Sequence, residues 1–298
     1  MPKLLCIGEV MAEIRLGHDG KQSLSYAGDT FNTAVYCARA LGDASDVSYL
    51  SRVGRDALSD GFLDAAKQHG LDLSHVEKDR DKNIGIYAIS TDKQGERHFD
   101  YWRENSAARQ LFSADSNCLE LPDAEVIYFS GITLAIMSPD ARDRFLDAAQ
   151  EKSLSGQVSI AFDSNYRPKL WENKTVAQNR IARAWEIADI ALPSIDDEML
   201  LFDEADEQDV VDRFQAKQWR GCAIKRGSRG PIAPHLSIEH HPKFVVNSSV
   251  VDTTAAGDSF NGGFLAALIR GSDIEDCLTA GHQIASQVVA HTGAIIAR

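Results

Sequence analysis

The chain has 298 residues, of which 44% are hydrophobic, and a formal net charge of −13 at pH 7. This hydrophobic content supports a packed core and excludes general disorder, and the length allows one large α/β domain or two small ones. The negative charge argues against a nucleic-acid partner, which needs a basic face, and no apolar run is long enough to span a membrane. The first residues turn acidic too early for a signal peptide, and the five cysteines form no CxxC pair, so we expect a cytoplasmic protein with reduced thiols.

Short apolar runs alternate with helical patterns along most of the chain. Strands are predicted at residues 4–7, 47–53, 126–130, 158–163, 190–193 and 221–225. Helices are predicted at residues 32–41, 57–69, 138–152, 175–188, 196–203, 207–219 and, as an apolar run, 264–269. Alternation of this kind predicts an α/β fold with a mostly parallel central sheet flanked by helices.

Two stretches interrupt the alternation. Residues 83–105 contain two β-rich runs joined by Asp92–Gly95, which is a hairpin signal, and residues 12–26 alternate around a Gly-rich turn. Together they predict a small antiparallel sheet that projects from the core. Such a sheet is marginal on its own, so we expect it to pack on the core or on a second subunit, as a lid or as the surface of a homo-oligomer. Residues 1–298 are therefore treated as a single domain that carries a lid.

The sequence Asp-Thr-Thr-Ala-Ala-Gly-Asp-Ser-Phe at residues 252–260 places small residues and a carboxylate where a helix begins. Free N–H groups at a helix N-terminus attract anions, and Asp258 would be positioned to accept a proton from a hydroxyl group. An anion cradle beside a base can move a phosphoryl group onto an alcohol. The alternative is an ordinary helix cap on a strand–helix turn.

Two other loops are candidates for ligand contacts. Residues 26–34 hold a glycine and polar side chains before a helix, where Asp29 and Asn32 either bind the hydroxyl groups of a sugar or belong to a simple cap. Residues 225–230 form a basic, Gly-containing loop after a predicted strand. Its glycines allow the backbone to approach a ligand closely, although an ordinary basic turn has the same composition.

Arg103 and Arg167 indicate an acidic substrate. Residues 163–168 follow a predicted strand at its carboxyl end, where ligands bind in open α/β sheets, and Arg103 lies on the predicted lid. Two arginines directed at one cleft suit a carboxylate, because a guanidinium offers a bidentate fork. Ordinary surface ion pairs are the alternative role for both residues.

Residues 252–260 resemble the C-terminal signature of the ribokinase-like (PfkB) carbohydrate kinases, and residues 26–34 resemble their N-terminal substrate motif. Tyr101-Trp102-Arg103, Asn165–Pro168 and Gly293–Ile296 occur in the same order as in the 2-keto-3-deoxygluconate kinase branch, and the resemblance covers nearly the whole chain. It implies a ribokinase-like three-layer fold with a β-sheet lid. It also implies transfer of the γ-phosphate of ATP to the 6-hydroxyl of 2-keto-3-deoxygluconate.

The resemblance implies a role for each matching residue. Asp258 would be the base, and Ala255, Ala256 and Gly257 would offer N–H groups to the transferring phosphate. The implied sugar contacts are Gly28, Asp29, Asn32, Tyr87, Tyr101, Arg103 and Arg167, besides Asp258. The implied neighbours of ATP are Asn165, Ser194, Lys225, Gly227, Gly230 and Gly257. Mg²⁺ would arrive with the nucleotide, no metal-ligating residue is assigned, and a monovalent cation near the anion-binding loop stays an open alternative.

The chain departs from the wider family at two places. Ala255 replaces the first glycine of Gly-Ala-Gly-Asp, a change familiar in the ketodeoxygluconate branch. Residues 194–197 stand where the wider family has Asn-x-x-Glu, which leaves open the metal-associated role of Asp197 or Glu198.

Two alternative functions share the same fold. One is a fructokinase or ribokinase acting on a neutral sugar, against which the two arginines argue. The other is a non-catalytic sugar-binding regulator, against which Asp258 argues. A dinucleotide-dependent dehydrogenase would need an early G-x-G-x-x-G after the first strand, which this sequence lacks.

Overall fold

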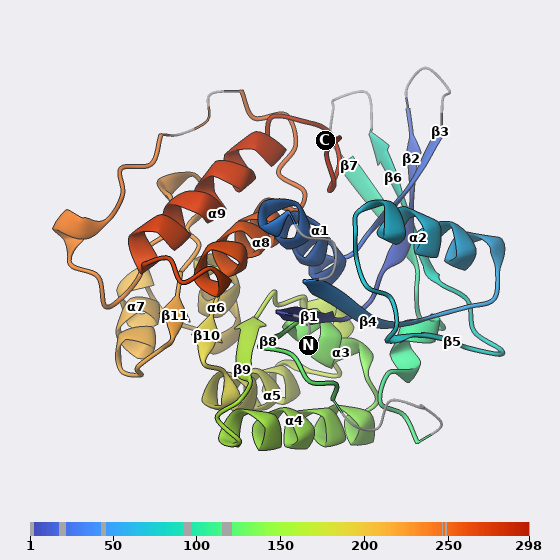
Figure 1. Cartoon of the computed structure of the whole chain (residues 1–298), viewed down its shortest axis with the longest axis horizontal. Coiled ribbons are helices and arrows are strands. Elements are labelled where there is room, and N and C mark those ends of the chain that lie inside the picture. The colour runs from blue at the N-terminus through green and yellow to red at the C-terminus, as the bar shows by residue number, and fades with distance from the viewer. Residues whose placement is uncertain are drawn as a thin grey trace.

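The computed structural model describes residues 3–17, 22–42, 46–91, 97–114, 121–245, 247 and 249–297. Its main sheet consists of β1 (Leu4–Ile7), β4 (Val47–Val53), β5 (Val76–Lys78), β8 (Val126–Ser130), β9 (Ser159–Asp163), β10 (Ile190–Ala191) and β11 (Gly221–Cys222). These seven strands lie in the order β11-β10-β9-β8-β1-β4-β5, and all neighbours pair in parallel (Figure 1). The predicted parallel α/β sheet is confirmed.

Helices cover both faces of this sheet and make it the middle of three layers (Figure 1). One face carries α1 (Asp29–Leu41), α2 (Ala57–Gln68), α8 (Ala256–Ile269) and α9 (Ile274–Val288). The other carries α3 (Gly131–Ile136), α4 (Pro139–Leu154), α5 (Lys174–Ile187), α6 (Ile195–Phe202) and α7 (Glu207–Gln215). Among the described residues, no helix has both the length and the apolarity that crossing a membrane would require.

The central strand β1 shows why its sequence is apolar at every position. Leu5 and Ile7 belong to the core beneath α3–α7, whereas Leu4 and Cys6 belong to the core beneath α1, α2, α8 and α9. Successive side chains of a strand point to opposite faces, so a strand covered on both sides needs a continuous apolar run rather than an alternating one.

A second, four-stranded sheet projects from the core at the upper right of Figure 1. It consists of β2 (Met11–Leu16), β3 (Gln22–Ala27), β6 (Gly85–Thr91) and β7 (Arg97–Trp102), in the order β3-β2-β6-β7. The two hairpins are antiparallel, but β2 and β6 pair in parallel, so the prediction of a wholly antiparallel sheet was wrong. The reason is topological: β2 follows β1 and β6 follows β5, and β1 and β5 run in the same direction in the main sheet. The predicted hairpin turn at residues 92–95 and most of the Gly-rich turn lie outside the described residues.

Several helices and strands end at other residues than predicted, because tertiary contacts override the local periodicity of the sequence. The helix predicted at residues 207–219 ends at Gln215, because the chain folds back and the Trp219 indole donates to the carbonyl of Phe214 at 2.7 Å. The strands predicted at residues 190–193 and 221–225 end at Ala191 and Cys222. The short elements α3 and β5 and the helix α9 were not predicted.

Candidate active site

The N-terminus of α8 forms an anion-binding end. Ala255 caps the helix in the left-handed region, at φ 59°, and the N–H of Ala256 donates to the carbonyl of Thr253 at 3.2 Å. The next two N–H groups, of Gly257 and Asp258, have no recorded acceptor among the described residues. They are the unpaired donors that a helix N-terminus offers to an anion.

The Asp258 side chain extends from this helix end toward α1. Asn32 Nδ2 donates to Asp258 Oδ2 at 2.8 Å, and Thr33 Oγ1 donates to the Asp258 carbonyl at 3.1 Å. Burial and the nearby Asp29 carboxylate raise the pKa of Asp258 to about 7, although the hydrogen bond from Asn32 acts in the opposite direction. A carboxyl group with this pKa is partly ionised at neutral pH and can exchange a proton with a hydroxyl group. The two motifs that were predicted from distant parts of the sequence therefore lie in contact.

A polar cluster lies beneath the anion-binding end, at the carboxyl end of β9. The Lys225 ammonium donates to the Asp163 carboxylate and, at 3.1 Å, to Asn261 Oδ1. Asn261 Nδ2 in turn donates to Asp163 Oδ2 at 2.7 Å and to the Tyr128 hydroxyl at 3.0 Å. A Cβ atom at Gly257 would lie 3.6 Å from Lys225 Nζ, so the ammonium is close to the free N–H groups. Asn261 was not predicted; its signal is a buried amide within an otherwise apolar helical run.

Asn165 lies beside a predicted sugar residue rather than in the nucleotide cavity. Its Nδ2 donates to Asp29 Oδ2 at 2.8 Å, and its backbone has φ 31°, which is unusual for a residue other than glycine. Gly28 is explained by packing: a Cβ atom there would lie 2.2 Å from the carbonyl oxygen of Glu9. This close approach requires glycine whether or not Gly28 also contacts a ligand.

The lid contributes three of the predicted sugar residues. The Tyr87 hydroxyl donates to the Glu13 carboxylate, and its ring stacks on that of Tyr101 with centroids 5.7 Å apart. Tyr101 is 47% exposed, whereas Arg103 is only 8% exposed and its guanidinium donates to the Glu9 carboxylate. The ion pair of Arg103 is thus buried, which rules out the exposed surface ion pair that was the alternative role for this residue.

Arg167 has a different environment. Its guanidinium donates to Asp197 Oδ1 at 3.2 Å and to the Tyr166 carbonyl at 2.8 Å, and the side chain is 51% exposed. Burial raises the pKa of Asp197, although Arg167 opposes this shift. In the described part of the chain Arg103 and Arg167 do not contact each other; each has its own carboxylate partner. Arg167 therefore does form the surface ion pair that was considered for it.

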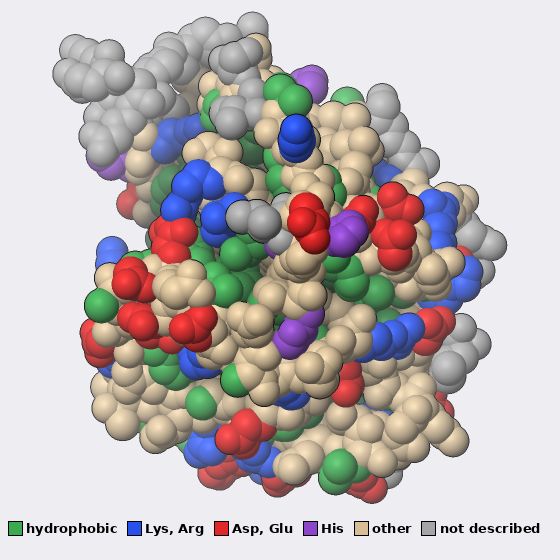
Figure 2. Space-filling model, turned by 90° about the vertical axis from the view of Figure 1, so that its left-hand side faces the viewer, with side chains coloured by type: hydrophobic (Ala, Val, Ile, Leu, Met, Phe, Trp, Pro, Cys, Tyr) green, Lys and Arg blue, Asp and Glu red, His purple; other side chains and the backbone are tan. Residues whose placement is uncertain are grey.

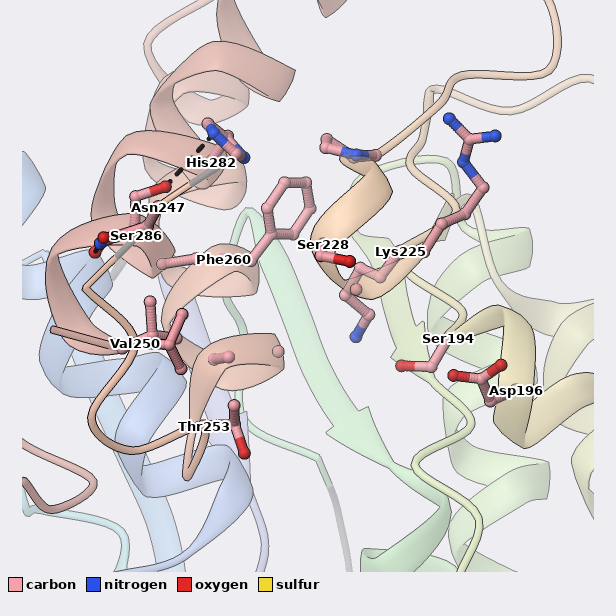
Figure 3. A pocket seen from close by; sticks show the side chains of 17 residues that line it. Ser194, Asp196, Lys225, Ser228, Asn247, Val250, Thr253, Phe260, His282 and Ser286 are labelled. Atoms are coloured by element: carbon pink, nitrogen blue, oxygen red, sulfur yellow. Dashed lines mark hydrogen bonds between the residues drawn. The ribbon is translucent and has the colours of Figure 1, made fainter. Parts of the chain in front are cut away.

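A cavity of about 350 Å³ opens beside the N-terminus of α8 (Figure 3). Four residues predicted to lie near a nucleotide line it: Ser194, Lys225, Gly227 and Gly257. Gly230 is not among the lining residues; its φ is 77°, and a Cβ atom there would meet the ring of Phe244 at 2.6 Å. Phe260, the last residue of the 252–260 signature, also lines it, and lining residues that the sequence did not reveal are Asn247, Val250, His282, Ser286 and Val289.

The two walls of the cavity come from different parts of the chain. His282 and Ser286 of α9 point into it from one side, and Ser286 Oγ lies 3.2 Å from His282 Nε2 (Figure 3). Lys225, Ser228 and Ser194 form the other side (Figure 3). In the space-filling view of this end of the molecule, hydrophobic side chains line a hollow between groups of acidic and basic side chains (Figure 2). A flat aromatic group and a chain of phosphates would each find a suitable surface here.

Two acidic residues near the cavity, Asp197 and Glu198, pair with arginines, whereas Asp196 lines the cavity with no ion pair recorded in the described part of the chain. Arg213 pairs with Glu198 at 2.8 Å, and burial raises the pKa of Glu198 to about 7 despite this pair. Asp197 pairs with Arg167, as described above. Within the described ranges, no group of three or more His, Cys, Asp or Glu could hold a metal ion on its own.

Asp252, the first residue of the signature, holds the loop before α8 in place. Its carboxylate accepts the N–H of Thr254 at 2.8 Å and the N–H of Gly293 at 2.9 Å, and it also accepts from the guanidinium of Arg97. Burial alone would raise the pKa of Asp252, but these hydrogen bonds outweigh burial and hold it at about 2. The Tyr36 hydroxyl fixes the C-terminal segment by donating to the carbonyl of Ala294 at 2.8 Å. The segment 293–296 therefore supports the anion-binding loop, and Arg97 is a site residue that sequence reasoning missed.

Comparisons with known proteins agree with this geometry. A family model described as pfkB family carbohydrate kinase matches residues 1–298. The chain is 36% identical to the 2-dehydro-3-deoxygluconokinase of Escherichia coli (strain K12) over 304 residues, which covers 99% of this chain and 97% of that protein. It is 35% identical to the protein of the same name from Dickeya dadantii (strain 3937), covering 97% and 95%.

Solved structures share the fold. A PfkB protein from Polaromonas sp. JS666 superposes with a TM-score of 0.80 at 23% identity, covering 97% of this chain and 96% of that one. Aminoimidazole riboside kinase from Salmonella enterica superposes with a TM-score of 0.79 at 22% identity, covering 97% and 94%. The ribokinase-like fold is thereby confirmed, and the family model shows that the chain belongs to the pfkB family of carbohydrate kinases.

Proposed function

We propose that this protein is a 2-keto-3-deoxygluconate kinase, the activity that is also named 2-dehydro-3-deoxygluconokinase. It transfers the γ-phosphoryl group of ATP to the 6-hydroxyl of 2-keto-3-deoxy-D-gluconate and gives 2-keto-3-deoxy-6-phosphogluconate. The observation that carries the reaction type is the Asp258 carboxyl, with a pKa of about 7, beside the free N–H groups at the N-terminus of α8. The full-length similarity to bacterial enzymes of that name supports the substrate.

Asp258 acts as the base in this mechanism. Its carboxylate accepts the proton of the sugar's terminal hydroxyl as the oxygen attacks phosphorus. The hydrogen bond from Asn32 fixes the orientation of the carboxylate, so that one oxygen stays available for the substrate. The pKa near 7 suits this task, because a base works best when its pKa is close to the working pH.

The charge on the transferring phosphoryl group is stabilised by the backbone. The N–H groups of Gly257 and Asp258 are free at the end of α8, where the helix dipole favours negative charge. Of the groups predicted from Ala255, Ala256 and Gly257, that of Ala256 donates instead to the Thr253 carbonyl. Lys225 lies beneath Gly257 and adds a positive charge at the same end. Ala255 keeps the loop in the left-handed turn that directs these groups outward.

The sugar lies between α1, the lid and residues 165–167. Asp29 and Asn32 bind hydroxyl groups, Gly28 lets the backbone approach, and Tyr87 and Tyr101 form a stacked aromatic wall.

Arg167 is half exposed, so the substrate carboxylate can reach its guanidinium and replace Asp197 as its partner. Arg103 retains other N–H donors besides the one recorded to Glu9, since a guanidinium carries five.

ATP occupies the cavity beside α8, with its phosphates directed at Lys225 and Gly257. Ser194 and Gly227, which were predicted to lie near ATP, also line this cavity, whereas Asn165 and Gly230, predicted for the same role, do not. A structural neighbour, aminoimidazole riboside kinase, was solved with an ATP analogue, which supports this choice of nucleotide. Mg²⁺ bound to the phosphates would neutralise their charge. Mg²⁺ that arrives with a nucleotide would be held mostly by its phosphates and by water.

The whole chain acts as one catalytic domain with a lid at residues 12–26 and 83–105, in the cytoplasm where ATP is available. The lid also serves as the contact surface of a homo-oligomer. Three large apolar side chains that are exposed on one face of this sheet support this: Leu16, Leu24 and Trp102. An exposed apolar face on a small sheet favours pairing with a second copy.

Nuclear magnetic resonance of the product tests the proposed reaction. The purified protein is incubated with ATP, Mg²⁺ and 2-keto-3-deoxygluconate labelled with ¹³C, and ³¹P–¹³C coupling locates the new ester. We expect coupling to C6 and equimolar formation of ADP. Phosphate on another carbon, or ADP formation without a sugar ester, would contradict the proposal.

A further inference from the structure

We propose that Arg97 is a positioning residue that acts as a built-in cation for the anion-binding loop, joining the lid to residues 251–254. The inference rests on the proposed kinase function, but it concerns a residue outside the set assigned to that function.

Three contacts of Arg97 converge on the loop. Its NH1 donates to Asp252 Oδ1 and, at 3.2 Å, to Thr254 Oγ1. Its NH2 lies 3.3 Å from the carbonyl of Val251, to which it donates. One guanidinium thus spans residues 251–254, which lead directly into the cap of α8. Fixing these residues fixes the direction of the free N–H groups that follow.

The positive charge of Arg97 compensates the buried negative charge of Asp252. Asp252 is 1% exposed, and its hydrogen bonds hold its pKa at about 2, so the carboxylate is ionised throughout the physiological range. A buried carboxylate requires a compensating positive charge. Arg97 supplies it by direct contact, and Arg15 adds a second guanidinium with NH1 at 3.7 Å from Oδ2.

The same contacts address the question, left open by the sequence, of whether a monovalent cation binds near the anion-binding loop. Both Asp252 oxygens already accept hydrogen bonds, from Arg97 and Thr254 on Oδ1 and from Gly293 on Oδ2. Each oxygen is thus already engaged by a donor, and the two guanidinium groups beside the carboxylate would repel a metal ion. A monovalent cation at Asp252 therefore does not fit the charges present, and the Arg97 guanidinium supplies the positive charge there instead.

Arg97 also connects the loop to the sugar side of the site. It begins β7 and pairs in register with Thr91, and Tyr101 lies on the same strand. The strand that presents Tyr101 to the sugar is therefore tied to the loop that holds the transferring phosphate. The position of the lid and the order of the loop are coupled through one side chain.

Arg97→Ala, compared with Arg97→Lys, tests the inference. We expect the Ala variant to lose about tenfold to hundredfold in kcat, because the N–H groups of α8 are less well oriented, with a smaller change in the KM for sugar. The Lys variant, which keeps the charge, should retain most of the activity. Guanidinium or K⁺ added at constant ionic strength should restore part of the kcat of the Ala variant and leave the native enzyme unchanged. Choline, a cation too large to enter, serves as the salt control.

Two further measurements distinguish the positioning of the loop by Arg97 from the general effect of removing an arginine that forms an ion pair. Hydrogen exchange of the amides of residues 254–257, measured without sugar, should be faster in Arg97→Ala; this readout does not depend on which sugar is the substrate. Arg183→Ala, which breaks an exposed ion pair with Asp147 on the outer helices, is the matched control and should change neither exchange nor kcat. If the native enzyme is inactive on the keto acid but the exchange difference appears, the proposed substrate fails and the role of Arg97 stands.

Three outcomes would overturn the role of Arg97: native kcat in the Ala variant, equal effects of guanidinium, K⁺ and choline on it, or unchanged exchange at residues 254–257. Should Arg97→Ala fail to fold, the double variant Arg97→Ala, Asp252→Asn removes the carboxylate together with its cation. It should then be more stable than the single variant, and equal or lower stability would contradict the charge-compensating role.

Discussion

Asp258→Asn should lower kcat by about 10²- to 10⁴-fold, the range expected for loss of a general base. Asparagine has the same shape and can still accept the hydrogen bond of Asn32 through its side-chain oxygen, so the sugar should bind with nearly native affinity. Steady-state kinetics give kcat, and calorimetric titration gives the affinity for sugar. Turnover near the native value would show that Asp258 is not the base.

The pH dependence follows from the same residue. Because the pKa of Asp258 is about 7, the carboxyl is increasingly protonated below neutral pH and loses its ability to accept a proton. The kcat of the native enzyme should therefore fall about tenfold per pH unit well below pH 7, and the residual activity of Asp258→Asn should lack this limb. A native profile that is flat from pH 5 to 8 would contradict the assignment.

Stability should change with pH in a defined direction. An aspartate normally has a pKa of about 3.9, so the folded protein binds a proton at Asp258 more tightly than the unfolded chain does. The ionised carboxyl therefore destabilises the folded state progressively as pH rises from about 4 to 7, and fully above 7. Asp258→Asn should gain stability relative to the native protein across this window. Asp273→Asn, at the N-cap of α9, is the control, because asparagine caps as well as aspartate and Asp273 lies outside the site.

Arg167→Leu should weaken the keto-acid sugar far more than ATP. Loss of a hydrogen bond to a charged group costs about 1.5–3 kcal/mol, which corresponds to roughly a ten- to hundredfold lower kcat/KM for the sugar. Asp197 would also lose its partner, so a small loss of stability is expected alongside. The KM for the sugar and the KM for ATP, each measured at a saturating concentration of the other substrate, separate the effect on sugar binding from the effect on ATP binding. If both ligands weaken equally, Arg167 does not bind the substrate carboxylate.

Two variants sharpen this test. Arg167→Lys keeps the charge but loses the bidentate fork, and should give an intermediate KM for the sugar. Arg103→Leu is a poorer probe, because it would leave the buried Glu9 carboxylate without its cation and destabilise the fold. Arg183→Leu again provides the control for removing an arginine that pairs with an aspartate.

Local pattern in the sequence was enough to predict the parallel sheet and most of its helices. Continuous apolar runs marked the strands buried on both faces, as β1 illustrates with Leu5 and Leu4 in opposite cores. The signature around Asp258 was readable because helix N-termini and capping residues have a characteristic composition. Contact between Asp258 and Asn32, separated by 226 residues, was expected only from the resemblance.

Other features depend on contacts that no local pattern reveals. The parallel pairing of β2 with β6 is set by the direction of the main-sheet strands that precede them. His282 and Asn247 line the cavity because α9 and the loop before α8 fold over it, and neither lies in a motif. Arg97 reaches Asp252 across 155 residues. Arg103 was predicted to lie on the lid and face the substrate cleft, and only the fold reveals its buried partner Glu9.

The most direct test is the ratio of kcat/KM for 2-keto-3-deoxygluconate to that for fructose, with ribose as a second neutral sugar, in a coupled assay of ATP consumption. We expect the keto acid to be preferred by about a hundredfold or more, because its carboxylate can bind Arg167 in place of Asp197, whereas a neutral sugar has no group that could do so. Equal or higher kcat/KM for fructose or ribose would contradict the assignment of the substrate, and no ATP-dependent phosphorylation of any of the three would contradict the catalytic account as a whole.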